Sequence, residues 1–442
     1  MILDFTIKNF RSIRGEMKII LEAESGQTKS ENTFEVTVPN DKKRKLLHSA
    51  VVYGANASGK TNVIRALYNL INYVKHSNDL SIDQHIPYYE PFLFDTEMET
   101  APTVFTFNFL VKEGKIYIQY NYQLSFNREE IIHEELNYYP KGQSHNLFTR
   151  TNETDSKSGT IHVGKLSKSL GYKEYDVFKN QLLLSKFGRE IPNETLAAVY
   201  LYFTTVEVWN ALDVIRIGNL KAEIATELFL SENSKLLHRI NKLIRIADTK
   251  INSIRIQESD KSQDKNFEER MRGGVIRKSR QRDNVLAMHT MYSNGEKSGT
   301  RALSLSEESA GTNVLFALGG IILRKLQDGG VLFFDELDNS LHPKLTKFLI
   351  RLFNNPISNP KNAQLIVATH EVTLLDKEVF RKDQIWFTEK NEQGVTELFS
   401  AKDFEGVRDD TPFDKWYMNG KFGGQPNIKE IEFIFSHGEE KA

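Results

Sequence analysis

The chain has 442 residues, 39% hydrophobic and 26% charged, and its 58 Lys+Arg and 59 Asp+Glu give a net charge of −1. This length predicts two or three structural units, and the composition excludes fully disordered, collagen-like and disulfide-framework proteins. The absence of cysteine excludes thiolate zinc sites and cysteine nucleophiles and is typical of a reducing compartment. Without a signal-peptide pattern or a long apolar run, we expect a soluble, cytoplasmic protein with no membrane segment.

The first half of the chain predicts a mixture of strands and helices. The apolar run LLHSAVVYG predicts a strand that ends at a glycine loop, and TNVIRALYNLINYV then has helical spacing. Apolar residues alternate over 103–126, which predicts an antiparallel hairpin. The polar stretch 140–172 predicts a long loop or a solvent-facing excursion, whereas 190–252 has a helical pattern with one buried face.

The second half returns to alternating helices and buried strands. Residues 257–300 are polar, and a helix is expected around 311–326. The buried strand VLFFDE, a helix over 343–354 and the buried strand QLIVATH follow. We therefore predict an α/β fold, a mixed sheet with flanking helices. We expect two core halves, 1–80 and 301–442, separated by an insertion, 81–300, in which a β-hairpin region precedes a helical region with the basic loop 270–282.

A phosphate-binding loop is the strongest motif. The segment GANASGKT from Gly54 to Thr61 matches G-x-x-x-x-G-K-[ST] between a predicted strand and a predicted helix. Glycines let backbone N–H groups face phosphates, Lys60 neutralises β- and γ-phosphate oxygens, and the Thr61 hydroxyl can bind Mg²⁺. The nucleotide-binding residues predicted here are Gly54, Asn56, Ser58, Gly59, Lys60 and Thr61.

Two carboxylates end the segment VLFFDE. Asp335 can hold Mg²⁺, with Thr61 as the other predicted metal ligand, and Glu336 is placed to polarise an attacking water. Such a pair alone often only marks the end of a strand. Combined with the phosphate loop, it predicts ATP hydrolysis, with ATP and Mg²⁺ as the cofactors.

Three further segments occur in a fixed order around this pair. A Ser/Gly helix start, with Ser309, Gly311 and Thr312, can bind an anion, although an ordinary capped helix is the alternative. Asp338 opens a tight polar turn, and His370 ends the strand QLIVATH, where it would face the same crevice. A lone histidine there is more often a capping or core residue.

The order of these motifs resembles the ABC-type ATPases of the SMC, RecF and OLD branch, and within it the AbiL/RloA-like anti-phage group, to which the PARIS ATPase is also similar. The NFRS segment, which ends at Ser12, is typical of that branch. Asn62 and the closing segment from Tyr417 to Pro426 are typical of it too. The resemblance implies that Arg11, Asn62 and Asp338 also bind nucleotide and that Glu336 and His370 are catalytic. It further implies that two chains sandwich ATP with their Ser309–Thr312 segments.

The same resemblance implies an ATPase that controls a separate toxin or TOPRIM-type nuclease in anti-phage defence, as a homodimer or higher oligomer. Its alternative is a RecF- or SMC-like DNA-repair clamp, and a third interpretation is a binding module with a structural nucleotide. The basic segment 270–282 could neutralise several phosphates of a nucleic acid, although it lacks aromatic residues for stacking.

Overall fold

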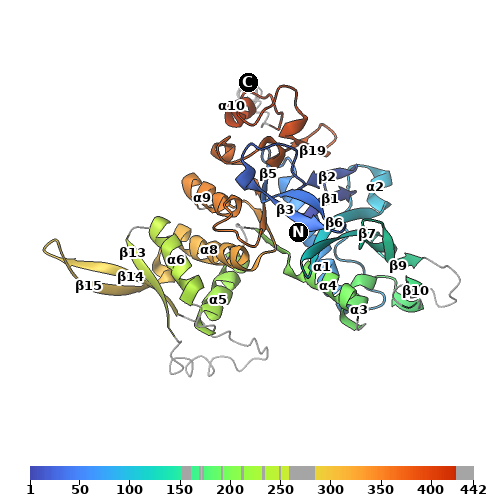
Figure 1. The fold of residues 1–442 in the computed structure, drawn as a ribbon, viewed down its shortest axis with the longest axis horizontal. Helices are drawn as coiled ribbons and strands as arrows, with labels where there is room; N and C mark the ends of the chain where they lie inside the picture. The colour runs from blue at the N-terminus through green and yellow to red at the C-terminus, as the bar shows by residue number, and fades with distance from the viewer. Residues whose placement is uncertain are drawn as a thin grey trace, which may run out of the picture.

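The computed structural model combines two large sheets, a helical lobe and a projecting arm (Figure 1). The residues that it describes are 1–151, 161–168, 171, 174–190, 193–210, 214–230, 234–247, 250–257, 284–339 and 341–424. The predicted α/β class is confirmed. None of the helices in these ranges is long and apolar enough to cross a membrane.

A six-stranded sheet forms the centre of the molecule. In spatial order its strands are β12 (Glu207–Asn210), β16 (Val331–Asp335), β17 (Gln364–Thr369), β5 (Ser49–Tyr53), β18 (Ile385–Lys390) and β19 (Thr396–Ser400). All neighbouring strands are parallel except β18 and β19. Strands β5, β16 and β17 are fully buried, as parallel strands covered on both faces must be. Their carboxyl ends therefore meet at one edge of the sheet.

An eight-stranded antiparallel sheet packs beside it. Its order is β11 (Glu174–Phe178), β10 (Ile161–Leu166), β9 (His145–Thr151), β8 (Ile131–Tyr138), β7 (Ile116–Phe126), β6 (Thr103–Glu113), β1 (Ile2–Lys8) and β2 (Met17–Ile20). The predicted hairpin is confirmed as β6 and β7. Of the two alternatives predicted for 140–172, the long loop is wrong, because β9 and β10 extend the sheet there. A separate two-stranded sheet contains β3 (Thr33–Val38) and β4 (Lys42–Leu47).

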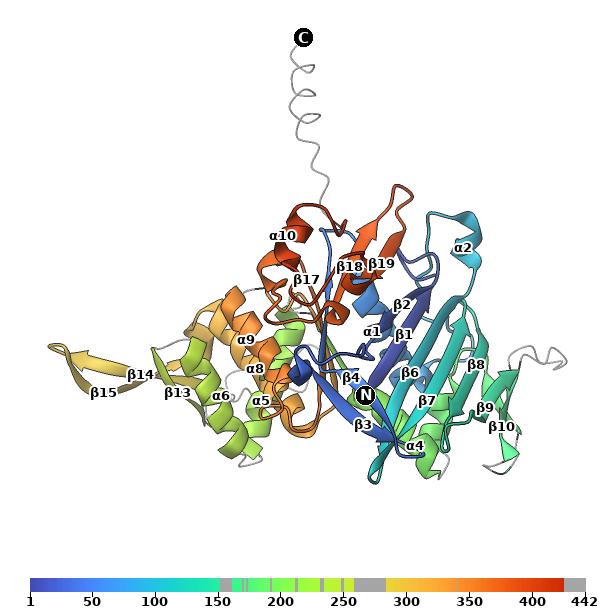
Figure 2. The ribbon, with the colours of Figure 1, turned by 45° about the horizontal axis from the view of Figure 1, so that its top comes forward.

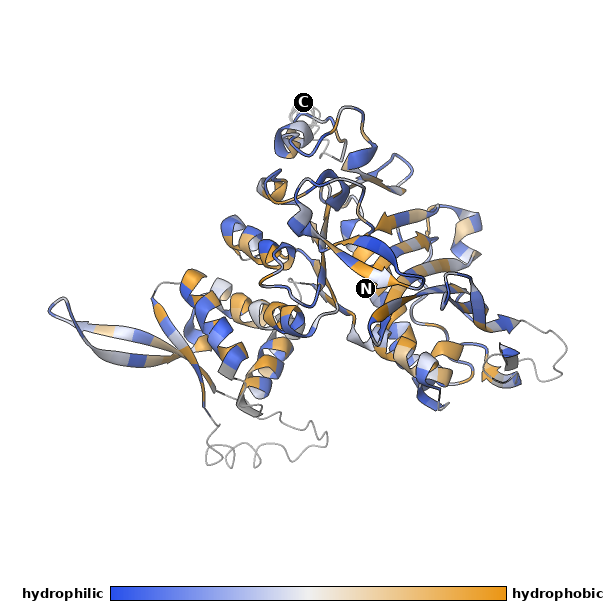
Figure 3. Ribbon diagram, in the orientation of Figure 1, coloured by the Kyte–Doolittle hydropathy of each residue, from blue (hydrophilic) through white to orange (hydrophobic). Residues whose placement is uncertain are grey.

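Helices cover both faces of the central sheet. Alternate β5 residues face opposite cores: Val52 packs with α1 (Lys60–His76), whereas Val51 packs with the helical lobe. The first core also contains α3 (Leu183–Glu190), α4 (Glu194–Thr205) and the antiparallel sheet. The lobe consists of α5 (Val214–Leu230), α6 (Ser234–Ala247), α8 (Ala310–Asp328) and α9 (Pro343–Asn354). Figure 3 shows that α8 and the central strands are largely hydrophobic.

The predicted helices of the lobe are confirmed, and one strand among them was not expected. Helices α8 and α9 match the predictions for 311–326 and 343–354. Helix α6 buries Leu236, Ile240, Leu243 and Ile244 of the predicted apolar face, whereas Ala247 is exposed and Ile251 belongs to β13. Strand β12 lies within the helical segment and pairs with β16 of the central sheet. The boundaries at residues 80 and 300 stay a prediction, but the predicted insertion contributes a strand to the core. Two helices are short: α2 (Thr96–Thr100) has no buried residue, whereas α10 (Phe413–Met418) buries Phe413 and Tyr417 in the core of the lobe.

A third sheet forms the projecting arm. Strands β13 (Ile251–Gln257), β14 (Asn284–Ser293) and β15 (Glu296–Ser304) pair in that order, and β14 and β15 continue outward as a hairpin (Figure 1). The turn is formed by Asn294 and Gly295, with φ of 53° and 85°. The polar segment 257–300 thus contains two strands that we did not predict. The basic segment 270–282 lies outside the described residues.

Candidate nucleotide-binding site

The phosphate loop joins the end of β5 to the start of α1 and has a tightly constrained backbone. Ala57 and Gly59 have φ of 65° and 105°, in the left-handed region that favours glycine. A side chain at Gly59 would also collide with the side chain of Thr396 on β19. Gly59 is the N-cap of α1 and brings no side chain to cap it, so the helix start is available to an anion.

Lys60 points back across this loop. Its Nζ donates hydrogen bonds to the carbonyl oxygens of Gly54 and Ala55, both at 2.8 Å, and the residue is only 6% exposed. Burial lowers the pKa of the Lys60 ammonium, whereas the charges of Glu336, Asp335 and Asp338 oppose that shift. The structure therefore brings the predicted lysine together with the predicted acidic residues.

Asp335, the last residue of β16, is the buried carboxylate of the site. It is 2% exposed, and its Oδ2 accepts a hydrogen bond of 3.0 Å from Nδ2 of Asn210 on β12. Its other oxygen, Oδ1, is buried and has no hydrogen-bond partner among the described residues. Burial raises the pKa of Asp335 to about 6, while the Thr61 hydroxyl and the Lys60 charge act in the opposite direction.

The unpartnered oxygen fits a bound cation. Carboxylate and hydroxyl oxygens are ligands that Mg²⁺ prefers, and the orphaned Oδ1 of Asp335 lacks a partner that a metal ion would supply. The exposed Thr61 lies at the start of α1. Asp335 and Thr61, the two predicted metal ligands, are thus compatible with Mg²⁺.

Glu336 leaves the strand with an uncommon backbone. Its φ is 58°, a left-handed conformation that costs a non-glycine residue about 1 kcal/mol or more. The Glu336 N–H donates to the carbonyl of Ala368 on β17 at 2.9 Å, and its carbonyl accepts from Asn339 at 3.0 Å. One hydrogen bond to β17 and one within the turn therefore hold the half-buried Glu336 in place.

Asp338 and His370 meet at the same edge. The Asp338 side chain is 7% exposed, and its Oδ2 lies 4.0 Å from Nδ1 of His370, which follows β17 and is 52% exposed. Asp338 Oδ1 is buried and makes no hydrogen bond with any described residue. The predicted pair thus combines a buried acceptor with an accessible imidazole.

Hydroxyl groups connect the elements around the loop: the turn after β1, the start of α1, β18 and β19. Asn62 Nδ2 donates to Ser12 Oγ at 2.6 Å, and Ser12 Oγ lies 2.7 Å from Thr396 Oγ1. Ser58 Oγ lies 2.7 Å from Thr388 Oγ1 on β18. These contacts fix the sides of the loop, whereas Asn56 at its tip is exposed.

Arg11 does not join this cluster. Its Nε lies 3.2 Å from Glu90 Oε2, and Arg65 of α1 shares the same carboxylate at 3.3 Å. The nucleotide contact predicted for Arg11 therefore stays a prediction.

The predicted signature segment is a separate cluster at the start of α8. Ser309 caps the helix, because its Oγ accepts from the N–H of Thr312 at 3.1 Å and lies 2.8 Å from Thr312 Oγ1. Within the described part of the chain, no hydrogen bond or ion pair joins Ser309 or Thr312 to the phosphate loop. Gly311 lies in the first turn of this helix.

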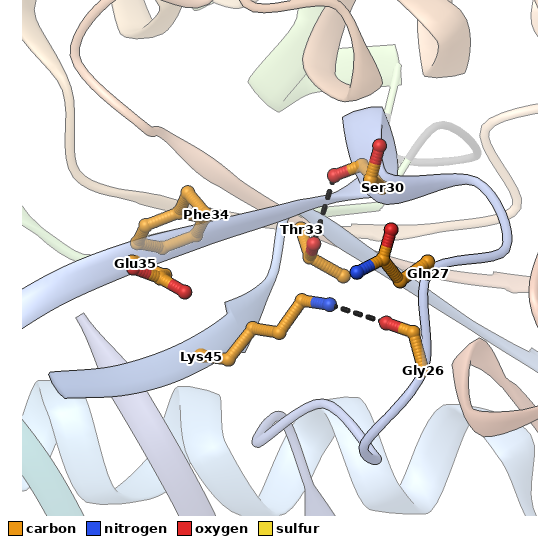
Figure 4. A pocket seen from close by; sticks show the side chains of 7 residues that line it. All are labelled: Gly26, Gln27, Ser30, Thr33, Phe34, Glu35 and Lys45. Carbon is orange, nitrogen blue, oxygen red and sulfur yellow. Dashed lines mark hydrogen bonds between the residues drawn. The ribbon is translucent and has the colours of Figure 1, made fainter.

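Sequence reasoning missed the polar residues that support the loop and Asp335. Asn210, Thr388 and Thr396 belong to short strands and have no motif around them. Their signal lies only in strand pairing, which places Asn210 opposite Asp335 in the sheet register. A hollow lined by Gly26, Gln27, Ser30, Thr33, Phe34, Glu35 and Lys45 contains none of the predicted site residues (Figure 4).

Comparison with known proteins places the chain in a family. It is similar to the SMC head domain from Thermotoga maritima, with 13% identity and a TM-score of 0.40 over 90% of this chain and 98% of that chain. It is similar also to the Smc head domain with an extended coiled coil bound to the C-terminal domain of ScpA, from Pyrococcus furiosus, with 14% identity and a TM-score of 0.39 over 90% and 96%. No curated protein matches the chain. Residues 49–376, more than half of the chain, match the family described as "AAA domain, putative AbiEii toxin, Type IV TA system", and the chain belongs to this AAA-domain family.

Proposed function

We propose that the chain binds ATP with Mg²⁺ and hydrolyses it. The observation that supports this most strongly is the facing pair formed by Lys60, held by two loop carbonyls, and the acidic edge after β16. Two carboxylate oxygens at that edge, on Asp335 and Asp338, are buried without a hydrogen-bond partner among the described residues. A triphosphate and its cation would supply the charges and ligands that these groups lack.

Each residue has a distinct role in this proposal. Lys60 and the start of α1 bind phosphate oxygens, and Thr61 and Asp335 hold Mg²⁺, which neutralises phosphate charge when it is bound. Glu336 orients the attacking water and accepts its proton. His370, kept at the strand edge beside Asp338, contacts the terminal phosphate.

Two substitutions separate binding from hydrolysis. Glu336→Gln should bind ATP normally and lose turnover about 10²-fold or more, because a positioned general base contributes that much. Lys60→Ala should weaken ATP binding itself. Equilibrium titration with ATP and steady-state phosphate release measure the two effects, with exposed Glu378→Gln as the control. Wild-type turnover in the Glu336→Gln protein would remove Glu336 from this role.

We further propose that ATP brings two chains together and that the closed assembly controls a separate effector protein. The self-contained cluster at Ser309, which makes no bond to the phosphate loop of its own chain within the described ranges, supports a contact with a second chain. The toxin named in the family description supports a toxin-like effector. The ATP-bound assembly can regulate the effector only if the open and closed states differ in affinity for it.

Light scattering and purification test this second step. The Glu336→Gln protein should gain mass when ATP is added, and affinity purification with the native operon should recover the effector. The purified chain alone should leave DNA and RNA intact in the presence of Mg²⁺ and ATP. An unchanged mass with ATP would contradict the dimer, and effector control that survives Lys60→Ala would show that ATP is not the switch.

A further inference from the structure

The described part of the closing segment, Tyr417–Gly424, lies against the phosphate loop. Its end is bonded to the loop directly, because the Ala55 N–H donates to the Gly424 carbonyl at 2.8 Å. The Tyr417 hydroxyl donates to the same carbonyl at 2.8 Å. The Gly54 carbonyl, which belongs to the same peptide group as the Ala55 N–H, accepts from Lys60 Nζ at 2.8 Å. A continuous chain of hydrogen bonds therefore runs from Tyr417 to the lysine of the loop.

Glycine is required where this segment approaches the loop. Gly423 and Gly424 have φ of 64° and 66°, in the left-handed region. A Cβ atom on Gly424 would lie 3.1 Å from the Thr388 carbonyl oxygen and 3.8 Å from Gly54 Cα. A Cβ atom on Gly423 would lie 2.6 Å from Glu389 Oε2. The backbone of this segment thus comes as close to the loop as side-chain-free residues allow.

An aromatic cluster anchors the segment to the central sheet. Phe422 is fully buried and stacks on Phe387 of β18 with ring centroids 4.7 Å apart, and Tyr417 stacks on the same ring at 5.7 Å. Phe387 is paired in the sheet with Tyr53, the residue before the loop. Figure 2 shows α10, which contains Tyr417, beside β18 and β19. The cluster therefore fixes the Gly424 carbonyl relative to β5.

We propose that Tyr417 and Gly424 are positioning residues that set the nucleotide affinity of the phosphate loop. They hold the Gly54–Ala55 peptide group, whose carbonyl accepts from Lys60 Nζ and orients the ammonium toward the position of the phosphates. A loop that is already ordered loses less conformational freedom when ligand binds, so the affinity is higher. This inference rests on the proposed binding of ATP, and it assigns to the closing segment a role in the site formed near the other end of the chain.

Three variants test the proposal. Tyr417→Phe keeps the ring and its stacking but removes the hydroxyl, and Gly424→Ala adds a methyl group against Thr388. Gly420→Ala is the matched control, because Gly420 has φ of 74° but no atom within 4 Å of the place that a Cβ atom would occupy. The dissociation constant of ATP, kcat and KM are measured for each, together with the thermal midpoint without nucleotide.

We expect Tyr417→Phe to raise the dissociation constant and KM about 3- to 10-fold, because the variant loses one hydrogen bond. Its kcat should stay within about twofold of wild type. Gly424→Ala should raise both by about tenfold or more, because it combines a left-handed alanine with a close contact. Gly420→Ala should bind ATP as wild type does.

Two results would overturn the proposal. One is wild-type affinity in both Tyr417→Phe and Gly424→Ala while Lys60→Ala loses binding, which leaves the proposed function intact. The other is an equal loss of affinity in Gly420→Ala, which would assign the effect to general strain in the segment. Absence of ATP binding by the wild-type chain, in contrast, would refute the proposed function itself and the inference with it.

Discussion

Two helix starts in this chain carry the predicted anion sites, and they differ in how they are capped. Helix α1 begins after Gly59, which has no side chain to offer, whereas α8 begins after Ser309, whose hydroxyl caps the helix itself. The first helix start is surrounded by Lys60 and buried carboxylates, and the second has a bonded Ser–Thr pair. The start of α1 is therefore left without a side-chain cap, whereas the start of α8 is capped by a side chain of its own chain.

The largest expected effect tests whether the α8 start completes a site in another chain. Lys60→Ala disables the loop and Gly311→Trp blocks the α8 start, so each protein alone should keep about 1% of wild-type turnover or less. Mixed in equal amounts, they should recover up to about a quarter of wild-type turnover, because half of the dimers then contain one intact composite site. Phosphate release by the mixture is the measurement.

The control for this mixture is the Lys60→Ala protein combined with a Lys60→Ala, Gly311→Trp double variant, which contains no intact phosphate loop. Recovery in the first mixture and none in the control would assign the two helix starts to one shared site. If the first mixture is inactive although both variants remain folded, the α8 start does not complete a site in another chain.

The buried carboxylates beside α1 should destabilise the protein when nucleotide and metal are absent. The start of α8 has no such buried carboxylate among the described residues. Asp335 has its pKa raised from 3.8 to about 6 by burial, so its ionised form destabilises the fold above that range and the cost disappears as pH falls toward 4. Asp335→Asn should therefore be more stable by about 1–3 kcal/mol at pH 7.5 without metal or nucleotide. Chemical denaturation at pH 7.5 and pH 5 measures the difference.

The gain should shrink at pH 5, because the wild-type carboxyl is then largely protonated. The exposed Asp328→Asn serves as the control and should show no such gain. An equal gain at both pH values would mean that burial of the charge is not its source.

A smaller effect is expected from the neighbour of Asp335. Asn210→Ala removes the amide that donates to Asp335 Oδ2 at 3.0 Å and so frees the carboxylate to rotate. The Mg²⁺ concentration for half-maximal turnover should rise about 10-fold, the lower end of the cost of losing a partner that orients a metal ligand. A magnesium titration of turnover measures this, and Asn210→Ser, which keeps a donor, should recover part of the loss. An unchanged Mg²⁺ requirement in both variants would show that β12 does not contribute to Mg²⁺ binding.

The elements predicted correctly are those whose pattern is set by burial. Helices α1 and α9 and the β6–β7 hairpin each bury one face, so their apolar residues recur at the period of the element. The middle of α8, from Leu315 to Leu323, is buried all round and reads as a continuous apolar run. Strand β15 escaped prediction because residues 296–303 are all exposed and have no such period. The Asn294–Gly295 pair, a frequent hairpin turn, was the signal that could have revealed it.

The site was predictable only as far as its local motifs reach. The loop GANASGKT predicted Lys60, and the acidic pair at the end of the strand VLFFDE predicted Asp335 and Glu336, each from adjacent residues alone. The pairing of Arg11 with Glu90 and of Asn210 with Asp335 depends on which strands become neighbours, and no short segment encodes that.

The hydroxyl contact between Ser12 and Thr396 joins residues that are 384 positions apart, and that between Ser58 and Thr388 spans 330. Contacts at such separations form late, because long loops must close before the contact can stabilise anything. During synthesis the phosphate loop leaves the ribosome long before the strands β18 and β19 that shape its sides. A growing chain therefore has the motif without the site, and the ability to bind ATP should emerge only when the central sheet is complete.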